Sequence, residues 1–192
     1  MQQLILASTS PYRKELLQRL GLEFVTAAPN VDESRRPGEA PEQLVRRLSA
    51  DKAQATAKKF PDALIIGSDQ IAVIDAEILT KPGTHENAVR QLQRCSGQSV
   101  TFLTGLCLLN ARSGKVQIEV VPFRVYFRAL NATQIENYLR REQPYNCVGS
   151  FKSEGLGIAL FERLEGDDPA TLIGLPLIRL TRMLEMEGRR VI

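Results

Sequence analysis

The sequence predicts an α/β fold in which helices flank one mixed β-sheet. Short apolar runs of strand length, such as residues 4–7 and 63–68, alternate with stretches whose apolar residues have helical spacing. Two longer runs, at 99–110 and 116–128, flank the turn-forming sequence at 112–115 and predict a long hairpin of antiparallel strands. With 192 residues and 43% hydrophobic content, the chain is large enough to bury a full core around such a sheet.

The first half of the chain alternates between the strand and helix patterns. Pro11 suits the first position of a helix, and Gly21 suits the position just after its end. Residues 29–41 are polar and rich in turn formers, and the stripe from Leu44 to Ala57 after them approximates helical spacing. The expected elements are strand 4–7, helix 11–20, strand 23–27, a long helix after Pro41, and strand-like runs at 63–68 and 71–74.

The second half contains recognisable helix boundaries. Thr84 is a suitable N-cap for a helix that reaches about Cys95, and Asn131 with Gln134 begins another that ends near Arg141. The expected elements are a loop at 79–83, these two helices, the hairpin between them, strand character at 157–163, an acidic turn at 165–168 and a final helix opened by Pro176.

Composition and charge argue against several classes of function. The net charge is only +3, from 25 basic and 22 acidic residues, and tryptophan is absent, so a nucleic-acid surface is not indicated. Three distant cysteines and a single histidine, His85, argue against structural zinc, and His85 is expected to be exposed. No signal peptide or bilayer-length apolar segment is visible, so we expect a cytoplasmic protein with no nucleic-acid and no membrane partner.

The first strand and the helix after it are joined by a sequence typical of an anion site. Ser8, Thr9 and Ser10 offer hydroxyl donors, and the first amides of the helix carry the positive end of its dipole. Arg13 offers a planar fork for phosphate oxygens. We call residues 8–13 the N-terminal cradle. The alternative, a capped turn with Arg13 in solvent, stays open on local pattern alone.

Four further charged residues are candidates for chemistry. Asp69 follows the buried run at 63–68, and ligands of open α/β sheets collect outside such strand ends. A carboxylate there binds Mg²⁺ or Mn²⁺, or takes a proton from attacking water. Taken singly, Asp69 also fits a turn residue, and Glu33, Lys52 and Lys81 also fit solvated charges. With the N-terminal cradle they supply what a metal-bound polyphosphate and an activated water require.

Other chemistries lack their characteristic sequence features. There is no G-x-S-x-G elbow, no P-loop and no histidine placed beside a nucleophile. Residues 155–157 precede a strand-like run rather than a helix, so they are not a dinucleotide fingerprint. Nothing in the sequence lowers the pKa of the Cys147 thiol, so packing is its expected role.

Taken together, the motifs resemble those of the Maf-like nucleoside triphosphate pyrophosphatases, and most closely the branch acting on 7-methyl-GTP. The similarity runs in order over nearly the whole chain. The motifs that carry it are Leu6-Ala7-Ser8-Thr9-Ser10-Pro11-Tyr12-Arg13, Val31-Asp32-Glu33, Lys52-Ala53, Gly67-Ser68-Asp69-Gln70, Leu79-Thr80-Lys81-Pro82, Thr104-Gly105 and Gly174-Leu175-Pro176-Leu177.

The resemblance implies a fold, a reaction and a set of site residues. The fold would be an elongated mixed sheet like that of the ITPases, forming a single domain over residues 1–192 with a central substrate cleft. Whether this domain has two lobes around the cleft is left open. The reaction would cleave a nucleoside triphosphate between its α and β phosphates, with Mg²⁺ or Mn²⁺. The implied residues are Ser8, Thr9, Ser10 and Arg13 for phosphate, Glu33, Lys52, Asp69 and Lys81 for catalysis, Glu33 and Asp69 for metal, and Tyr12, Gln70 and Glu154 for substrate choice.

Departures from the family pattern bear on the base that is recognised. The dTTP/UTP-directed branch typically has threonine after the catalytic aspartate, where this chain has Gln70. Guanine presents N–H donors that a carboxylate accepts, and N7 methylation makes the base cationic, which favours Glu154 and an aromatic face such as Tyr12. A dTTP/UTP pyrophosphatase and a nucleotide-binding regulator without turnover stay open as alternatives. A nucleoside triphosphate is the expected partner, and a homodimer is also left open.

Overall fold

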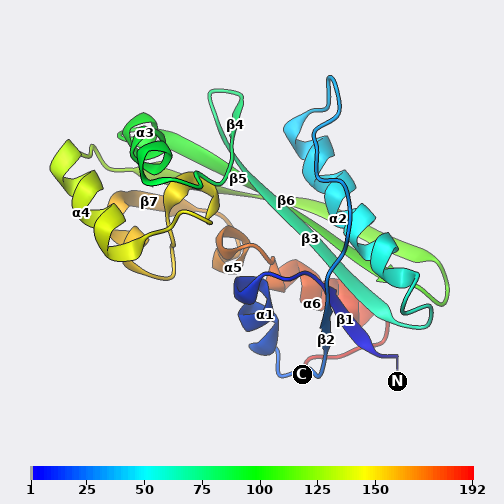
Figure 1. The fold of residues 1–192 in the computed structure, drawn as a ribbon. Helices are drawn as coiled ribbons and strands as arrows, with labels where there is room; N and C mark the ends of the chain where they lie inside the picture. The colour runs from blue at the N-terminus through cyan, green and yellow to red at the C-terminus, as the bar shows by residue number, and fades with distance from the viewer. Residues whose placement is uncertain (1) are drawn as a thin grey trace. The chain divides into compact units, whose positions relative to one another are not determined.

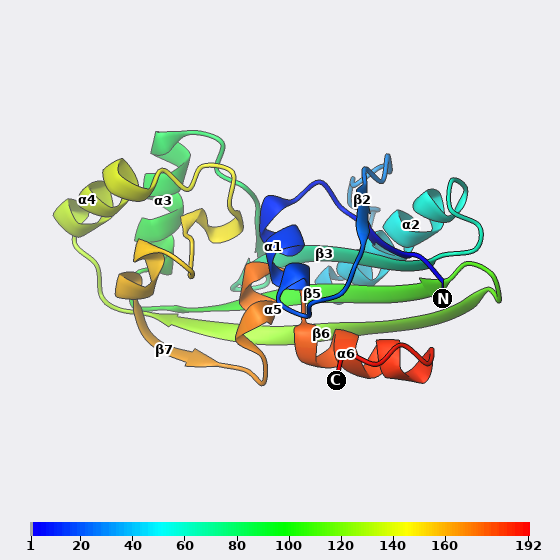
Figure 2. The ribbon, with the colours of Figure 1, turned by 90° about the horizontal axis from the view of Figure 1, so that it is seen from below.

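The computed structural model describes residues 2–192 and confirms the α/β fold, with helices packed beside one mixed sheet (Figures 1 and 2). The strands are β1 (Leu4–Ala7), β2 (Val25–Ala27), β3 (Leu64–Ile74), β4 (Glu77–Leu79), β5 (Ser99–Asn110), β6 (Lys115–Phe127) and β7 (Phe161–Glu165). The helices are α1 (Pro11–Gln18), α2 (Pro41–Ala57), α3 (His85–Cys95), α4 (Ala132–Glu142), α5 (Pro169–Ile173) and α6 (Leu177–Met186), with short 3-10 helices η1 (Val148–Ser150) and η2 (Leu156–Leu160).

The seven strands run in the order β2-β1-β3-β5-β6-β7, with β4 paired to β3. Strand β1 is parallel to both of its neighbours, and Ala7 lies opposite Gly67 of β3. The carboxyl end of β1, followed by Ser8, therefore lies level with Gly67, and Ser68 and Asp69 continue along β3 from that point. Strand β4 is antiparallel to β3, and β7 is antiparallel to β6.

The chain divides into two compact units. The first contains the residues up to Gln70, residues 104–121 and residues 168–192, and the second contains residues 71–103 and 122–167. Strands β3, β5 and β6 contribute residues to both units. The first unit holds the N-terminal cradle together with α2, α5 and α6, and the second holds α3 and α4.

Both faces of the sheet are covered in the first unit, as the packing of the β1 side chains shows. Leu4 and Leu6 pack with the apolar residues of α1 and α6, while Ile5 and Ala7 pack with Ala53 of α2. Successive side chains of a strand point to opposite faces, so a strand covered on both sides is apolar throughout. This is why residues 4–7 form a continuous apolar run rather than an alternating pattern.

Helix α2 lies very close to the sheet at two glycines. A β-carbon at Gly67 of β3 would lie 2.0 Å from the carbonyl oxygen of Ser49, and one at Gly105 of β5 would lie 2.2 Å from that of Val45. Any side chain at either position would push the helix away. The two glycines therefore determine how deeply the middle of α2 sits on the sheet.

In the second unit, the expected helix starts are confirmed. The Thr84 hydroxyl accepts a hydrogen bond from the Asn87 amide at 3.2 Å, and Asn131 and Gln134 form a capping box at the start of α4. The core of this unit includes edge-to-face pairs among Phe102, Phe127, Phe151 and Phe161, with ring centroids 4.8–5.7 Å apart.

Several expectations about secondary structure were wrong. The runs at 63–68 and 71–74 form one strand, β3, because the polar residues between them find partners without leaving the strand. The strand expected at 157–163 begins only at Phe161, because Gly157 packs against the Lys152 backbone in η2. Helix α5 and strand β4 were not expected. His85 is half-buried rather than exposed, and it bonds Tyr145 and Glu136.

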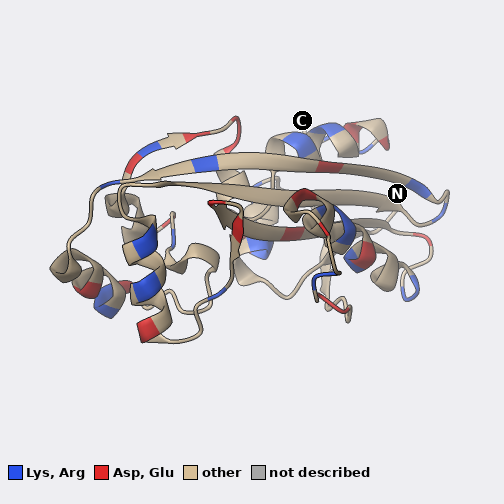
Figure 3. Cartoon of the chain, turned by 90° about the horizontal axis from the view of Figure 1, so that it is seen from above, with Lys and Arg blue, Asp and Glu red and all other residues tan. Residues whose placement is uncertain are grey.

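The distribution of charged and apolar side chains over the helices is the last feature of the fold. Acidic and basic side chains both occur along α2 and α3, in keeping with the mild net charge (Figure 3). Among residues 2–192, no helix has both the length and the apolar character needed to cross a membrane.

Candidate active site

The N-terminal cradle is built by hydrogen bonds within its own turn. The Ser8 hydroxyl accepts from the Ser10 amide at 3.1 Å, and the Ser10 hydroxyl accepts from the Arg13 amide at 3.4 Å, which caps α1. Ser8 is buried, whereas Thr9 is exposed. Each hydroxyl that accepts in this way keeps its own hydrogen to donate. The cradle therefore combines a capped turn with hydroxyl donors at the positive end of a helix.

Arg13 is half-buried and anchored, so the alternative that places it in solvent is wrong. Its Nε donates to the carbonyl oxygen of Gly174 at 2.9 Å. Burial lowers the pKa of Arg13, and the negative charges of Asp69 and Glu33 oppose that shift. Arginine remains protonated in proteins, so a fixed positive charge faces these two carboxylates.

The Gly174 carbonyl is a junction that connects the cradle to strand β3. It accepts from Ser68 as well as from Arg13, with the Ser68 hydroxyl at 3.0 Å. Gly174 has φ +122°, a value that L side chains rarely adopt. Sequence reasoning included Ser68 and Gly174 in motifs but assigned them no role. The signal was present, because Gly174 follows a short, mostly apolar run at 170–173 and lies two residues before Pro176.

Lys52 brings the two predicted carboxylates together. Its ammonium donates to Asp69 Oδ1 at 2.6 Å and lies 2.7 Å from Glu33 Oε1. The Lys52 side chain is 7% exposed and that of Asp69 is 12% exposed, whereas that of Glu33 is 62% exposed. A buried ammonium needs carboxylate partners to offset its lost hydration. One ammonium shared by two acids therefore forms the centre of the candidate site.

The close approach of α2 to the sheet explains why Lys52 reaches Asp69. Lys52 lies between Ser49 and Ala53, the two residues that a β-carbon at Gly67 would strike. Asp69 is two residues beyond Gly67 on the same strand, so it faces the same side of the sheet. The glycine thus sets the distance between helix and strand, and with it the ion pair.

An arginine of α2 holds the loop that carries Glu33. Arg47 Nε donates to Glu39 Oε1 at 2.6 Å, and its Nη2 donates to Glu39 Oε2 at 2.9 Å and to the Ser34 carbonyl at 3.0 Å. The hydrogen bonds from Arg47 hold the pKa of Glu39 at about 2, well below its usual range. This arginine therefore fastens the residue after Glu33 to the helix that bears Lys52.

Replacing Glu39 by glutamine is expected to destabilise the protein at neutral pH and to make little difference in strong acid. A carboxylate whose pKa is depressed on folding adds stability above its unfolded pKa, and that stability is lost as pH falls towards the folded value of about 2. Urea unfolding of both proteins between pH 7 and pH 2.5 measures this. The control is Glu42→Gln, which changes an exposed carboxylate in the first turn of α2. A wild-type advantage that persists unchanged at pH 2.5 would contradict the assignment.

Gln70 is held by its amide nitrogen. Gln70 Nε2 donates to the Thr171 carbonyl at 2.7 Å, the Thr104 hydroxyl at 2.9 Å and the Leu172 carbonyl at 3.2 Å. The Thr104 hydroxyl also donates to the Thr171 carbonyl, at 3.0 Å. Thr104 and α5 therefore orient Gln70, a role that sequence reasoning did not assign. Tyr12, for which the family resemblance also implies a role in substrate choice, is half-buried in the first turn of α1.

The first unit thus contains the cradle, Glu33, Lys52, Asp69 and Gln70. Lys81 and Glu154 belong to the second unit, and both are exposed there. Lys81 lies in the segment between β4 and α3. Glu154 lies between η1 and η2, where Ser153 donates to its carboxylate at 3.3 Å.

The two carboxylates suit an incomplete divalent-cation site. Within residues 2–192, no group of three or more His, Cys, Asp or Glu side chains is arranged to hold a metal ion. Glu33 and Asp69 converge on a single point, the Lys52 ammonium. Mg²⁺ is usually held by one or two carboxylates and completes its shell with water and substrate phosphates. The donor set therefore fits a cation that arrives with a polyphosphate, and does not form an all-protein cage.

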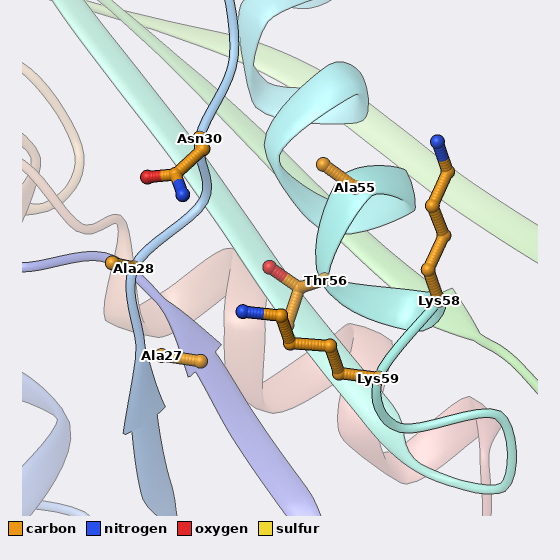
Figure 4. Close-up of a pocket in the computed structure, with 7 residues that line it drawn as sticks. All are labelled: Ala27, Ala28, Asn30, Ala55, Thr56, Lys58 and Lys59. Atoms are coloured by element: carbon orange, nitrogen blue, oxygen red, sulfur yellow. The ribbon is translucent and has the colours of Figure 1, made fainter.

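A small pocket in the first unit lies apart from these residues. Ala27, Ala28, Asn30, Ala55, Thr56, Lys58 and Lys59 line it, and Figure 4 shows the Lys59 side chain reaching across towards Thr56. The two lysines follow the carboxyl end of α2, where positive charge complements the helix dipole. None of the predicted site residues lines this pocket.

Comparison with solved structures supports the fold. The chain is similar to the Staphylococcus aureus Ham1 protein, with a TM-score of 0.54 over 97% of this chain and 100% of that one. Sequence identity in this comparison is 12%, so the likeness concerns the fold alone.

Comparison of sequences identifies the family. The chain is 58% identical over 189 residues to the 7-methyl-GTP pyrophosphatase of Nitrosococcus oceani, covering 98% of this chain and 95% of that protein. It is 57% identical over 188 residues to the 7-methyl-GTP pyrophosphatase of Pseudomonas aeruginosa, covering 98% of both. Residues 3–187 match the family described as Maf-like protein. This match spans nearly the whole chain, and the protein belongs to the Maf-like protein family.

Proposed function

We propose that this protein is a nucleoside triphosphate pyrophosphatase that hydrolyses 7-methyl-GTP to 7-methyl-GMP and diphosphate. The observation that carries the proposal is 57–58% identity, over 98% of the chain, to two proteins named for that activity. The grouping of Lys52, Glu33 and Asp69 with a cradle suited to phosphate supports it. On this proposal the protein is a hydrolase acting on acid anhydrides.

Asp69 is the proposed general base. In the reaction, a P–O bond forms from a water oxygen, the anhydride bond between the α and β phosphates breaks, and Asp69 takes the proton of the water. Lys52, which donates to Asp69, orients its carboxylate and offsets the negative charge that develops on the phosphates. Glu33, on the exposed side of Lys52, helps to orient the water.

The cradle is the proposed phosphate-binding element. Ser8, Thr9 and Ser10 present hydroxyls at the amino-terminal end of α1, and Arg13 contributes a guanidinium held through its Nε. Because Nε is already bonded to Gly174, the guanidinium loses little further freedom when it binds an anion. Lys81 is proposed to supply a second ammonium for the phosphates, a role that rests on the family resemblance alone.

Glu33 and Asp69 are the proposed ligands of a divalent cation. Bound Mg²⁺ or Mn²⁺ would neutralise phosphate charge and polarise phosphoryl oxygens. Lys52 would keep the two carboxylates from repelling one another before the cation and the nucleotide arrive.

Base recognition is proposed for Tyr12, Gln70 and Glu154. Anchoring of the Gln70 amide nitrogen by Thr104 and α5 leaves its orientation well defined. An exposed carboxylate such as Glu154 suits the N–H donors and the positive charge of 7-methylguanine.

The Glu154→Ala variant is expected to lose selectivity for 7-methyl-GTP. Loss of a charge-assisted hydrogen bond worth about 1.5–3 kcal/mol would lower kcat/KM for 7-methyl-GTP about 10- to 150-fold. We expect smaller losses for UTP and dTTP. Diphosphate release from a panel of nucleotides with added Mg²⁺ measures this. The control is Glu162→Ala, which removes another exposed carboxylate of the same unit.

The same panel separates the alternatives. A wild-type protein that prefers dTTP or UTP would contradict the proposed substrate. Binding of nucleotide without turnover, at protein concentrations far below substrate, would instead indicate a nucleotide-binding regulator.

We further propose a cytoplasmic location, which fits three free cysteines, two of them buried. The proposed partner is the nucleoside triphosphate itself. The absence of nucleic-acid binding stays a prediction, and formation of a homodimer stays open.

A further inference from the structure

The segment that carries Lys81 is held by hydrogen bonds on both sides of that residue. The Thr80 carbonyl accepts from Gln91 Nε2 at 2.9 Å, and the Pro82 carbonyl accepts from Asn87 Nδ2 at 2.8 Å. The Gly83 amide donates to the Tyr145 carbonyl at 2.9 Å. Lys81 is exposed between these fastened backbone groups. The backbone of a surface segment is thus fixed on either side of one lysine.

The two amide side chains come from successive turns of α3. Asn87 and Gln91 are four residues apart, so they lie on the same side of the helix. They border the buried stripe of Ala88, Leu92 and Cys95, which packs α3 into its unit. The helix that bears the two amides is therefore a rigid support, and both amides are directed at the same segment.

A second layer of contacts orients each amide. The Gln91 Oε1 accepts from the Ser150 hydroxyl at 2.5 Å, and the Asn87 Oδ1 accepts from Arg90. In each amide the oxygen is therefore occupied by a donor, which turns the NH₂ group towards the Lys81 segment. Ser150 is fully buried and has φ +62°, a left-handed conformation that non-glycine residues rarely adopt. A strained, buried serine that contacts Gln91 suggests that the orientation of this amide matters.

We propose that Gln91 and Asn87, with Ser150 behind Gln91, are positioning residues that orient Lys81 for the reaction. The proposal rests on the proposed function, in which Lys81 acts on the phosphates. A loop-borne ammonium is more effective in catalysis when its backbone is held near one geometry before substrate binds. The paired carbonyl contacts provide this restraint without touching the ammonium itself.

The Gln91→Met variant tests the proposal, because it removes the donor to Thr80 and keeps the length of the side chain. We expect kcat/KM for 7-methyl-GTP to fall about 10- to 100-fold, mostly through kcat. Gln93→Met, at an exposed position of the same helix, is the matched control and should leave both parameters unchanged. Asn87→Ala, which removes the donor to Pro82, is the second variant should Gln91→Met fail to fold.

A double-mutant cycle with Lys81 separates positioning from a general structural role. In a Lys81→Met background, Gln91→Met should cause no further loss, because there is no ammonium left to orient. Ser150→Ala should likewise add nothing to Gln91→Met. If Gln91→Met lowers kcat/KM equally with and without Lys81, the positioning role is overturned. It is also overturned if neither Gln91→Met nor Asn87→Ala lowers kcat/KM. If Lys81→Met alone leaves turnover unchanged, the proposed role of Lys81 fails and the positioning proposal fails with it.

Discussion

The Asp69→Asn variant is expected to lower turnover of 7-methyl-GTP by about 10²–10⁴, the range for loss of a positioned acid–base group. The asparagine oxygen still accepts from Lys52, so the local hydrogen bond and the fold should be kept. What the variant loses is the negative charge that takes the proton of the water. Diphosphate release at saturating 7-methyl-GTP, together with a urea unfolding curve, measures both properties.

Asp62→Asn is the matched control for this experiment. Asp62 is an exposed acid of the same unit that pairs with Arg112 at the surface, and its loss should leave turnover unchanged. Exposed pairs of this kind contribute little to stability. Near-normal turnover in Asp69→Asn would show that Asp69 is not the base. A large fall in the urea midpoint would show instead that its charge is needed for folding.

The Gly67→Ala variant is expected to lose both stability and activity. Its β-carbon would lie 2.0 Å from the Ser49 carbonyl oxygen and 3.0 Å from the Ala53 amide nitrogen, both backbone atoms that cannot rotate away. Helix α2 must then move outwards, which takes Lys52 away from Asp69. Overpacking of this kind costs about 1–3 kcal/mol and sometimes more. Urea midpoints and diphosphate release should therefore fall together.

Gly21→Ala distinguishes this packing effect from a general cost of replacing glycine. Gly21 has φ +65°, and within residues 2–192 a β-carbon at this position would meet no atom closer than 4 Å. Alanine there therefore encounters only backbone strain, of about 1 kcal/mol. Its activity should stay at the wild-type level. If Gly67→Ala were no less stable and no less active than Gly21→Ala, the close approach of α2 would not position Lys52.

Elements with local signals were predicted well from the sequence. The starts of α3 and α4 followed from Thr84 and Asn131, whose side chains bond amides only three residues away. The strands β5 and β6 followed from two long apolar runs around one turn. Such features depend on residues that are close together in the chain, so they can be predicted from the local sequence pattern.

Elements that depend on distant partners were missed. The polar residues at 67–70 resemble the end of a strand, yet β3 continues because Asp69 pairs with Lys52 and Ser68 bonds Gly174. These partners lie 17 and 106 residues away along the chain. No local sequence pattern indicates these distant contacts.

By itself, the sequence determined which chemical groups suited to a polyphosphate the protein has: hydroxyls before a helix, one guanidinium, two ammonium groups and the carboxylates. Only the tertiary structure decided which of these groups meet. It placed Lys52 between Glu33 and Asp69 and anchored Arg13 on the Gly174 carbonyl. The physical reason is that a lone charge is stable in water, whereas a buried one requires an opposite charge or a hydrogen-bond partner. Those partners come from distant segments that packing of α2 and the sheet brings together.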